Sequence, residues 1–558
     1  MNRKTLIGLI LIGAILLFWP TYLSLVFPEE NTPVAPEKEP VTLSKEKESP
    51  SSSSPEKRAP SVSEEKELLT KIQTPLYSAV ISNKNGGSIV SFIIKKHLKE
   101  GEEQIQLVDD YNKENLLVSY INLSGEEVLL DGFWSFSQPA YQGKTIKKES
   151  FVLDEKSPDA KLSFYTETSG EVVEKSLLFN YNSYAVKIDT DLEPAEEGIL
   201  EGKFRLDWVG GIPLTEDSKQ ESFFLEGLVS QGGSIQSYRV GSASLFGGGS
   251  SQIEESFKIY SGDTDFAGYR TKYFGVFLKP QKTDEVKVIK YGSSDRPEVD
   301  ILTTQEINFK KTTLFFGPLE YEEIANLDVG LEDKILGWQW LSSVSWLIYI
   351  IMVSLYGFIP NYGVVVILFA VLIKAVTYPL MAKQLRSTKK MQEIQPELNK
   401  IKLKYKSDPA LQQQKMSALF QKSGVNPLAG CLPMLVQFPV LIAVFMVFRN
   451  TIEFRGEPFF LWITDLASPD TLFMLGSIPI NVLPFLMSLS MFYTMKVSTA
   501  AQSSGGDPAQ EATQKMMKYM FPGMMFFLFY GFPSGLNLYY LCFNVIQIIQ
   551  QKIINKEK

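Results

Sequence analysis

The sequence predicts a polytopic α-helical membrane protein with six transmembrane helices and an exported all-β domain. Three observations support this fold class. Long uncharged stretches fill the C-terminal part of the chain, alternating apolar and polar residues fill the part before it, and charge divides unequally between the two. Residues 338–558 carry a net charge of +9, from 19 Lys and Arg against 10 Asp and Glu, whereas residues 1–337 carry −17. The overall charge of −8 therefore averages two unlike parts.

Several kinds of chemistry are excluded by composition. His97 is the only histidine, so one chain holds neither a histidine-based triad nor a histidine cluster for a metal. The two cysteines, Cys431 and Cys542, lie in apolar runs and form no CxxC motif. Gly143-Lys144-Thr145 lacks the leading glycine of a phosphate-binding loop. We expect no cofactor, no metal and no enzymatic activity.

The N-terminal segment 1–27 is predicted to be a transmembrane anchor. No charge occurs between Thr5 and Phe27, and about 20 apolar residues suffice to span a bilayer as a helix. A cleaved signal peptide is the alternative, but the stretch ends without a small-residue cleavage site. Residues 28–68 follow with seven prolines and the serine run 51–54, a composition typical of a disordered linker; a binding tail is the other interpretation.

Residues 69–332 have the pattern of a large antiparallel β-sandwich. Tyr77, Ala79 and Ile81 alternate with polar residues, Asn85-Gly86 is a hairpin turn signal, and residues 89–94 form a partner strand. Similar short runs recur at 285–291 and 312–316, separated by turn residues. We interpret the glycine run 247–249 as a loop, because no GK[ST] follows it.

Charge asymmetry predicts how the helical part crosses the membrane. Residues 382–427 hold ten Lys and Arg but three acids, so this segment should be a cytoplasmic helical hairpin. The connector 449–470 holds two bases and four acids and should lie outside. If residues 346–359 and 363–381 both crossed, the basic hairpin would lie outside. Residues 333–360 are therefore predicted to form an interfacial amphipathic helix, with Trp338, Trp340, Trp346 and Tyr349 at headgroup level.

The remaining boundaries follow from this topology. Transmembrane helix 2 is predicted at 361–381, transmembrane helices 3–6 within 428–553, and a cytoplasmic tail at 554–558. The helices within 428–553 come from three uncharged runs, 423–448, 471–495 and 519–551, the last divided at a turn signal, 531–535. These spans are short and contain several prolines, which favours local thinning of the bilayer. Their many methionines suit either varied apolar partners or ordinary packing.

Lys374 is the exceptional residue of the membrane part. It lies eight residues before the basic hairpin, about 12 Å from the cytoplasmic end of an α-helix. No other charged residue lies in the uncharged runs to pair with it. A lysine there must either extend to the headgroups or face a hydrated cavity. A Ser–Lys dyad with Ser488 or Ser490 is conceivable, but their spacing gives it no support.

The basic hairpin has two predicted helices. Met391, Ile394, Leu398, Ile401 and Tyr405 form one apolar stripe on the first, and Asp408-Pro409 and Gly424 bound the second. Two interpretations remain open for this pair: a connector lying on anionic lipid, or a docking arm for a ribosome or nascent chain.

Four motifs in order resemble the YidC/Oxa/Alb family of membrane-protein insertases. They begin at residues 372, 426, 461 and 532 and read LIKAVTYPL, NPLAGCLP, LWITDL and FPSGLNLYY. Gly86-Gly87 and Phe316-Gly317-Pro318 also resemble the form of YidC that carries a large periplasmic domain. The resemblance implies that the exported domain is a β-supersandwich.

What the resemblance implies about function is more specific. The family members insert and chaperone membrane proteins, alone or with the Sec translocon, through a hydrophilic groove that carries one basic residue. Lys374 falls on the basic position, where many members have arginine, and Tyr539, Tyr540 and Gln437 are expected to line the groove. The expected residues for cytoplasmic substrate reception are Arg386, Lys389, Lys390, Lys402 and Lys404.

The resemblance also implies partners and location. Nascent membrane proteins, Sec translocon subunits, the ribosome and membrane lipids are the expected partners. The protein should lie in the bacterial inner membrane with both termini cytoplasmic and residues 28 to about 345 periplasmic. Two rival classes are a channel or transporter, which would conduct solute without nascent protein, and a binding protein whose activity lies in the exterior domain.

Overall fold

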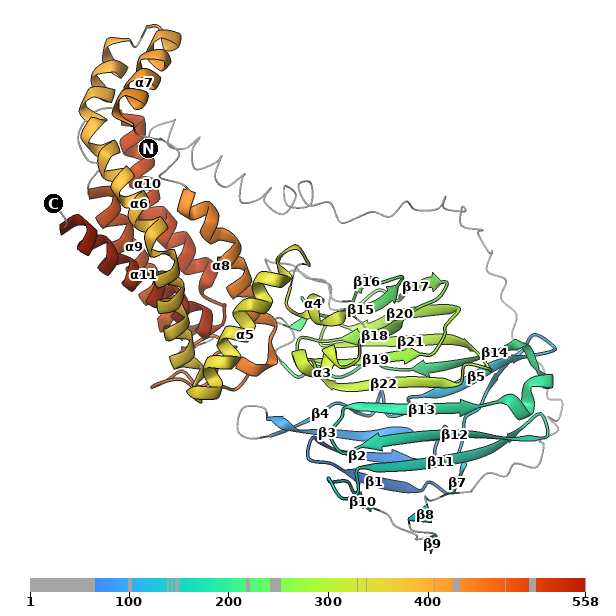
Figure 1. Ribbon diagram of the computed structural model, residues 1–558. Helices are drawn as coiled ribbons and strands as arrows, with labels where there is room; N and C mark the ends of the chain where they lie inside the picture. The colour runs from blue at the N-terminus through green and yellow to red at the C-terminus, as the bar shows by residue number, and fades with distance from the viewer. Residues whose placement is uncertain are drawn as a thin grey trace.

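The computed structural model describes residues 66–556, with gaps at 99–102, 138–139, 142–143, 146–149, 217–220, 241–251, 329, 338, 406, 425–431, 477 and 501–507. The predicted anchor 1–27, nearly all of the linker 28–68 and the glycine run 247–249 lie outside the described residues. A sheet-rich region and a bundle of helices lie side by side (Figure 1).

Three large sheets build the sheet-rich region. A five-stranded sheet has the order β10 (Ser150–Val152), β1 (Leu69–Gln73), β2 (Tyr77–Ser82), β3 (Ser88–Leu98), β4 (Gln104–Gln106). A nine-stranded sheet has the order β16 (Ser234–Arg239), β15 (Glu226–Gln231), β18 (Phe266–Arg270), β19 (Phe274–Pro280), β22 (Lys311–Pro318), β13 (Ala185–Asp191), β12 (Glu171–Asn180), β11 (Asp159–Thr168), β7 (Ser135–Ser137). A six-stranded sheet has the order β17 (Ser256–Ser261), β20 (Glu285–Ser293), β21 (Arg296–Glu306), β14 (Ile199–Trp208), β5 (Leu117–Asn122), β6 (Glu127–Leu129).

Smaller elements complete this region. A short pair joins β8 (Ala140–Tyr141) to β9 (Lys144–Thr145), and a 3₁₀ helix, η1 (Glu193–Gly198), precedes β14. All strand pairs in the three large sheets are antiparallel except β1 with β10. The prediction of a large, mostly antiparallel β-sandwich is thus confirmed.

One aromatic core joins the three large sheets. Phe316 of β22 packs against Trp208 of the six-stranded sheet and Phe92 of the five-stranded sheet, with ring centroids 4.8 and 4.6 Å apart. Two predicted motifs belong to this core. A Cβ added at Gly86 would lie 2.8 Å from the Trp134 ring, and one added at Gly317 would lie 2.7 Å from Tyr184. Glycine at both positions is therefore a packing requirement.

The predicted hairpin turn at Asn85-Gly86 is confirmed, because β2 and β3 pair antiparallel on either side of it. Asn85 and Gly86 both have positive φ, 55° and 67°, a conformation that asparagine and glycine adopt most readily.

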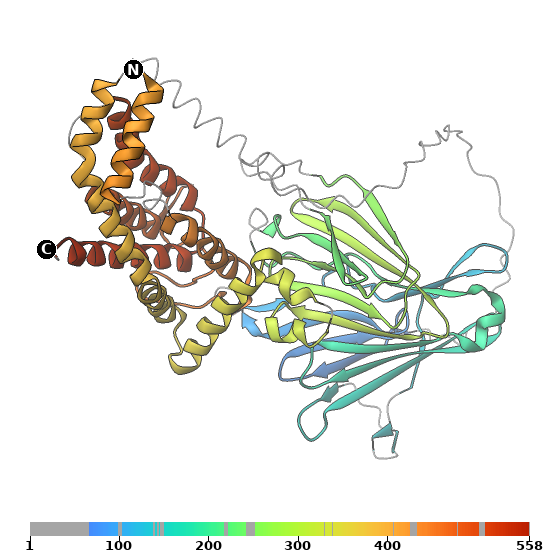
Figure 2. The ribbon, with the colours of Figure 1, turned by 45° about the horizontal axis from the view of Figure 1, so that its top comes forward.

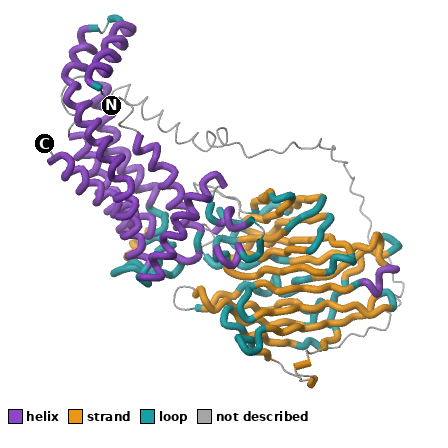
Figure 3. The backbone as a smooth tube through the Cα atoms, viewed as in Figure 1, coloured by secondary structure: helices purple, strands orange, loops and turns teal. Residues whose placement is uncertain are grey.

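The bundle contains α5 (Ser342–Phe358), α6 (Tyr362–Lys404), α7 (Pro409–Ser423), α8 (Leu432–Asn450), α9 (Val482–Ala500), α10 (Pro508–Phe529) and α11 (Ser534–Lys556). Short elements α3 (Tyr321–Ala325), α4 (Leu331–Ile335) and η2 (Gln339–Leu341) lead into it from β22, and η4 (Ile452–Phe454) follows α8. The predicted turn at 531–535 separates α10 from α11 as expected. Figure 3 shows the helices gathered on one side and the strands on the other.

By length and composition, one helix in the described residues is long and apolar enough to cross a membrane, within Tyr362–Pro379. Shorter apolar helices cover Ser342–Phe358 and Phe438–Asn450. The count of six spans therefore stays a prediction. The predicted interfacial helix 333–360 is not one helix, because its first part belongs to α4 and η2 and only α5 forms the rest. α5 packs on α6 and α8 and exposes Trp346 and Leu347, and its place at the membrane interface stays a prediction.

One predicted span differs from the structure. Residues 471–495 do not form a single helix, because their first part is a hairpin of β23 (Thr471–Leu475) and β24 (Ile478–Asn481), and α9 begins only at Val482. Gly476 lies in the turn with φ +65°, and Pro479 has no N–H to donate within a helix. An uncharged run alone does not distinguish a helix from an apolar hairpin.

The predicted helical hairpin is confirmed and forms an arm. α7 starts at the predicted cap, where the Asp408 side chain accepts from the Leu411 N–H at 3.0 Å, and it ends before Gly424, which has φ +59°. The first helix of the arm continues α6 without a break past residue 381, although Pro379 and Pro396 lie inside it. Figure 2 shows the arm projecting beyond the rest of the bundle.

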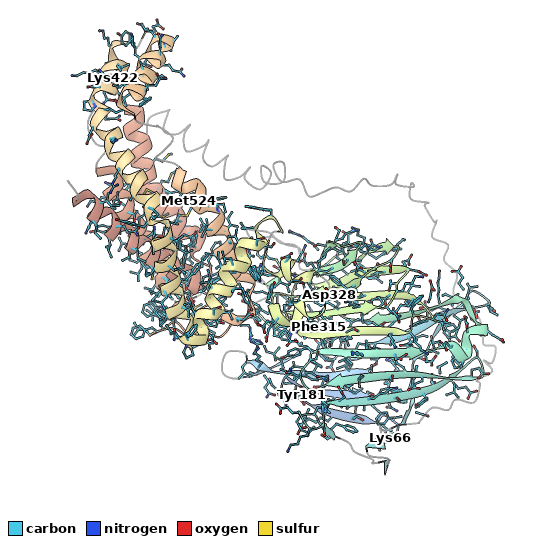
Figure 4. All side chains as sticks on the ribbon, in the orientation of Figure 1. Lys66, Tyr181, Phe315, Asp328, Lys422 and Met524 are labelled. Carbon is cyan, nitrogen blue, oxygen red and sulfur yellow. The ribbon has the colours of Figure 1, made fainter. Side chains whose placement is uncertain are left out.

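Polar contacts fix the sheet-rich region to one end of the bundle. The Arg455 guanidinium, after α8, pairs with Glu216 at 2.6 Å and donates to the carbonyl of Leu98 at 2.8 Å. The Asn450 amide donates to the Ile335 carbonyl at 3.1 Å. In Figure 4, Asp328 marks the segment that joins the two parts. The carboxyl-terminal end of α8 therefore faces the sheets.

A buried lysine joins two turns of the sandwich. Lys175 of β12 is completely buried, and its Nζ donates to the carbonyls of Asn85 and Leu116 at 3.1 and 2.5 Å. Burial lowers the pKa of Lys175 from 10.5 to about 7. A neutral amine has two N–H donors, and the two carbonyls supply one acceptor for each. The site therefore fits the uncharged form of Lys175.

The pH dependence of unfolding tests this interpretation. Because the folded-state pKa of Lys175 lies below the unfolded value, the unfolded chain binds the extra proton between pH 7 and 10.5, and folding stability rises with pH there. For residues 69–332, we expect the free energy of chemical unfolding to rise by up to about 1.4 kcal/mol per pH unit between pH 7 and 9. Lys175→Met should remove this rise. Lys187→Met, at an exposed position of β13, is the control and should keep the wild-type slope. Equal slopes for wild type and Lys175→Met would contradict the assignment.

Candidate functional site

Lys374 lies where α6 meets the last helix, α11. Its Nζ donates to the Oε1 atom of Gln547 and lies 3.2 Å from the centroid of the Phe543 ring. The side chain of Gln550 donates in turn to the Lys374 backbone carbonyl at 3.3 Å. In the described part of the chain, no carboxylate forms an ion pair with Lys374. The cation is thus held by one neutral amide and one aromatic face.

The direction of this side chain bears on the two alternatives for Lys374. Its partners lie on a neighbouring helix, so the ammonium points across the bundle and does not extend to the headgroups. Lys374 is also only 1% exposed, which differs from the open, hydrated cavity that we expected around it. Gln547 and Phe543 cover it because both come from the same face of α11, four residues apart.

Tyr539 and Tyr540 occur one turn before Phe543 on α11. Tyr539 is buried and packs against Phe543 and against Phe369 of α6, with centroids 5.8 and 5.9 Å apart. Tyr540 is also buried and makes an edge-on contact with Phe529 of α10 at 5.2 Å. The structure therefore brings Lys374, Tyr539 and Tyr540 together around α11, with Phe543 between the lysine and Tyr539.

A row of amides on α11 belongs to the same site and was missed from the sequence. Asn544, Gln547 and Gln551 recur every three or four residues and so share a face with Tyr540. The Asn544 amide donates to the Ser490 hydroxyl of α9 at 3.2 Å. The signal that could have found this row was available, because amides at helical spacing in an uncharged apolar run such as 519–551 are unusual.

The structure gives no support to a Ser–Lys dyad. The Ser490 hydroxyl donates to the Met487 carbonyl of its own helix at 2.6 Å and accepts from Asn544. The Ser488 hydroxyl is buried and has no hydrogen-bond partner among the described residues. Lys374 donates to Gln547 instead of either serine.

The remaining predicted residues lie on α6 and α8. Arg386, Lys390 and Lys404 are exposed on the part of α6 that belongs to the arm, and Lys402 is half-buried where its carbonyl accepts from Gln412 of α7 at 2.9 Å. Lys389 lies on the same helix and Gln437 on α8, but their side chains are outside the described part of the structure. In Figure 4, Lys422 marks the second helix of this arm and Met524 lies in the bundle.

Family models cover nearly all of the described chain. The model described as "YidC periplasmic domain" matches residues 69–351, and the model described as "60Kd inner membrane protein" matches residues 354–558. Their boundary falls within α5, the first long helix of the bundle.

Curated relatives match over the full length. Proteins described as "Membrane protein insertase YidC" from Chlorobaculum parvum and Chlorobium limicola are each 32% identical over 100% of this chain, and the match covers 94% and 95% of those proteins. The protein of the same description from Chlorobium luteolum is 33% identical over 88% of this chain and 83% of its own length.

Solved structures give weaker matches. A galactose mutarotase related enzyme from Lactobacillus acidophilus matches 45% of this chain and 97% of its own, at 11% identity and a TM-score of 0.25. An α-galactosidase from Geobacillus stearothermophilus matches 46% of this chain and 42% of its own, at 7% identity and a TM-score of 0.26. Scores this low support no conclusion about fold or activity.

The family follows from the agreement of three independent findings. The relatives named as insertases match from end to end, the two family models together cover the sheet-rich region and the helices, and the motifs at 372, 461 and 532 lie in the helical part, where the first of them carries Lys374. This chain belongs to the YidC family of membrane protein insertases, in the form that carries a periplasmic domain.

Proposed function

We propose that this chain inserts newly made proteins into the bacterial inner membrane, alone or with the Sec translocon, and chaperones their folding. In this proposal Lys374 attracts acidic groups of the substrate into a hydrophilic groove between the helices. Six helices span the membrane, both termini are cytoplasmic, and residues 28 to about 345 are periplasmic. The observation that carries the proposal is the set of partners of Lys374, all of which are neutral.

The energetics favour exchange of these partners for a substrate carboxylate. A lysine already paired with an internal acid would gain little from a second one. Lys374 donates to a neutral amide, whereas a carboxylate would add the Coulomb attraction of a full negative charge, which is strong where the surroundings are apolar. A carboxylate that displaces Gln547 would therefore bind the ammonium more strongly than the amide does. Gln547 satisfies the cation until that exchange occurs.

Unsatisfied polar groups on α9 and α11 support a hydrated groove. The hydroxyls of Tyr540 and Ser488 and the Oε1 atom of Gln550 are buried without a hydrogen-bond partner among the described residues. Buried polar atoms without a protein partner are usually satisfied by water or by a ligand. In our proposal the apolar part of the substrate then leaves along the faces of α8 and α11, driven by its transfer into lipid.

The cytoplasmic arm gives the proposal its entry point. Arg386, Lys390 and Lys404 expose positive charge on the part of α6 that projects from the bundle. We infer that the arm receives nascent chains, and that it does so beside the ribosome. The alternative, that the same charges bind anionic lipid, predicts different results in the arm experiment below.

The first test concerns the charge of residue 374. Lys374→Arg should retain insertion of single-span substrates with acidic ends, because it keeps the positive charge, whereas Lys374→Ala and Lys374→Glu should lose most of it. Insertion into proteoliposomes measures the effect. Lys496→Glu, an exposed charge change near the end of α9, is the control and should insert normally. Wild-type rates for both the alanine and the glutamate variants would exclude an electrostatic role for Lys374.

The second test concerns Gln547. Gln547→Glu would give Lys374 an internal carboxylate, so we expect a folded chain that inserts acidic substrates poorly. Gln547→Leu would leave a buried cation without its acceptor and should cost about 1–3 kcal/mol of stability. Thermal unfolding in detergent and the insertion assay measure both effects. Gln104→Leu, the same change at an exposed position of β4, is the control and should change neither. Normal insertion by Gln547→Glu would show that substrates do not need a free Lys374.

The third test separates the two interpretations of the arm. Combined Lys402→Glu and Lys404→Glu substitutions should lower photocrosslinking to ribosome-bound nascent membrane proteins, because they reverse charge on the proposed receiving helix. Lys415→Glu with Lys422→Glu is the matched control on α7 and should have a smaller effect. If both pairs acted equally, and only when the liposomes contain anionic lipid, the arm would be a lipid contact instead.

A further inference from the structure

The β23–β24 hairpin exposes apolar side chains on both of its faces. Leu472, Phe473, Met474, Leu475 and Ile478 are all exposed, Leu475 to 65%. Its two strands pair only with each other in the described part of the chain. An isolated two-stranded hairpin is marginally stable in water, and an exposed apolar edge promotes aggregation. A surface of this kind requires a partner that covers it.

The base of the hairpin is held rigidly. Asp470 accepts from the N–H groups of Val482 and Leu483, which begin α9, at 2.9 and 2.6 Å. Asn481 accepts from the Thr471 hydroxyl at 2.8 Å and donates to the Tyr530 carbonyl, after α10, at 2.7 Å. The polar groups are thus used at the base, and the apolar side chains extend from it toward the turn at Gly476.

The contacts of the connector that carries the hairpin show at which end of the bundle the hairpin lies. The hairpin belongs to the connector between α8 and α9, and Trp462 of that connector donates to Asp470 at 3.2 Å. The same connector holds Arg455, which pairs with Glu216 of the periplasmic region. The hairpin is therefore at the periplasmic end of the bundle, and Figure 3 shows it at the edge of the helices, away from the large sheets.

The apolar surface of the hairpin continues onto α9. Phe485, Leu489 and Tyr493 are exposed at intervals of four residues and form one face of that helix. No charged residue occurs from Thr471 to Met495. A protein partner would more commonly meet a surface with a polar rim, whereas acyl chains require an apolar surface alone. Continuity with the face of α9 that would meet lipid therefore favours lipid as the occupant.

We propose that the β23–β24 hairpin inserts into the outer leaflet of the membrane and is covered there by lipid acyl chains. The proposal rests on the topology given under the proposed function, in which α9 crosses the membrane. The open edges of the ribbon carry unpaired N–H and C=O groups, which are costly in hydrocarbon. The hairpin, about 17 Å long by its strand rise, therefore lies along the boundary between headgroups and acyl chains and not at the bilayer centre.

Depth-dependent quenching tests the proposal on the full chain in proteoliposomes. A polarity-sensitive fluorophore is attached to single cysteines at Leu475, at Leu489 of α9 and at Val152, an exposed position of β10. The background carries Cys431→Ser and Cys542→Ser and must first retain insertion. The liposomes contain phosphatidylcholine with a nitroxide either near the headgroup or near the end of the acyl chain.

We expect blue-shifted emission at Leu475, with most of its fluorescence lost to the shallow nitroxide and less to the deep one. Leu489 should be quenched by nitroxide lipid as part of a membrane helix, and Val152 by neither lipid. If Leu475 behaves like Val152 while Leu489 is quenched, the hairpin proposal is wrong and the topology stands. If neither Leu475 nor Leu489 is quenched, both are wrong. Blue-shifted but unquenched emission at Leu475, with energy transfer between labelled copies, would identify a second chain as the occupant and overturn the proposal.

Discussion

The arrangement of the bundle depends on how one buried cation is satisfied. Lys374 lies in a region without other charges, and leaving an ammonium unpaired there would cost far more than a single packing contact provides. Gln547 and Phe543 satisfy it from α11, so the second predicted span and the last one are held together by this contact. The packing of Tyr539 against Phe369 extends the same pairing toward the periplasmic end.

A second constraint orients the exterior domain. The junction uses charged and polar groups, among them Arg455, Glu216 and Asn450, and these are largely shielded from solvent. On the bundle side of the junction, the Tyr349 hydroxyl of α5 donates to Glu453 of η4 at 2.6 Å and so ties α5 to the segment that carries Arg455. Directional bonds of this kind fix an angle as well as a contact, which apolar packing alone does less well. The aromatic core around Phe316 makes the sandwich itself a stiff body on that junction.

Much of this organisation could be predicted from the sequence, because strong local signals agree with the fold. The turn at Asn85, the cap at Asp408 and the helix break before Ser534 depend on residues whose preferences are nearly independent of context. The β23–β24 hairpin could not be predicted in the same way, since an apolar run satisfies a helix and a buried strand equally. The enclosure of Lys374 was missed for a different reason. It depends on Gln547, which lies 173 residues further along the chain, and a single sequence does not show which distant amide faces a lysine.

One continuous helix, α6, carries both the Lys374 site and the first half of the arm. This helix extends from Tyr362 through Lys374 to Lys404, about 65 Å at the rise of an α-helix. A load on the tip of the arm therefore acts as a torque on the segment that carries the buried cation. Pro379 lies five residues after Lys374, between it and the arm. It removes one backbone hydrogen bond, so α6 bends more easily there than in its neighbouring turns. Pro379 is therefore a point at which the arm can bend relative to the segment that carries Lys374.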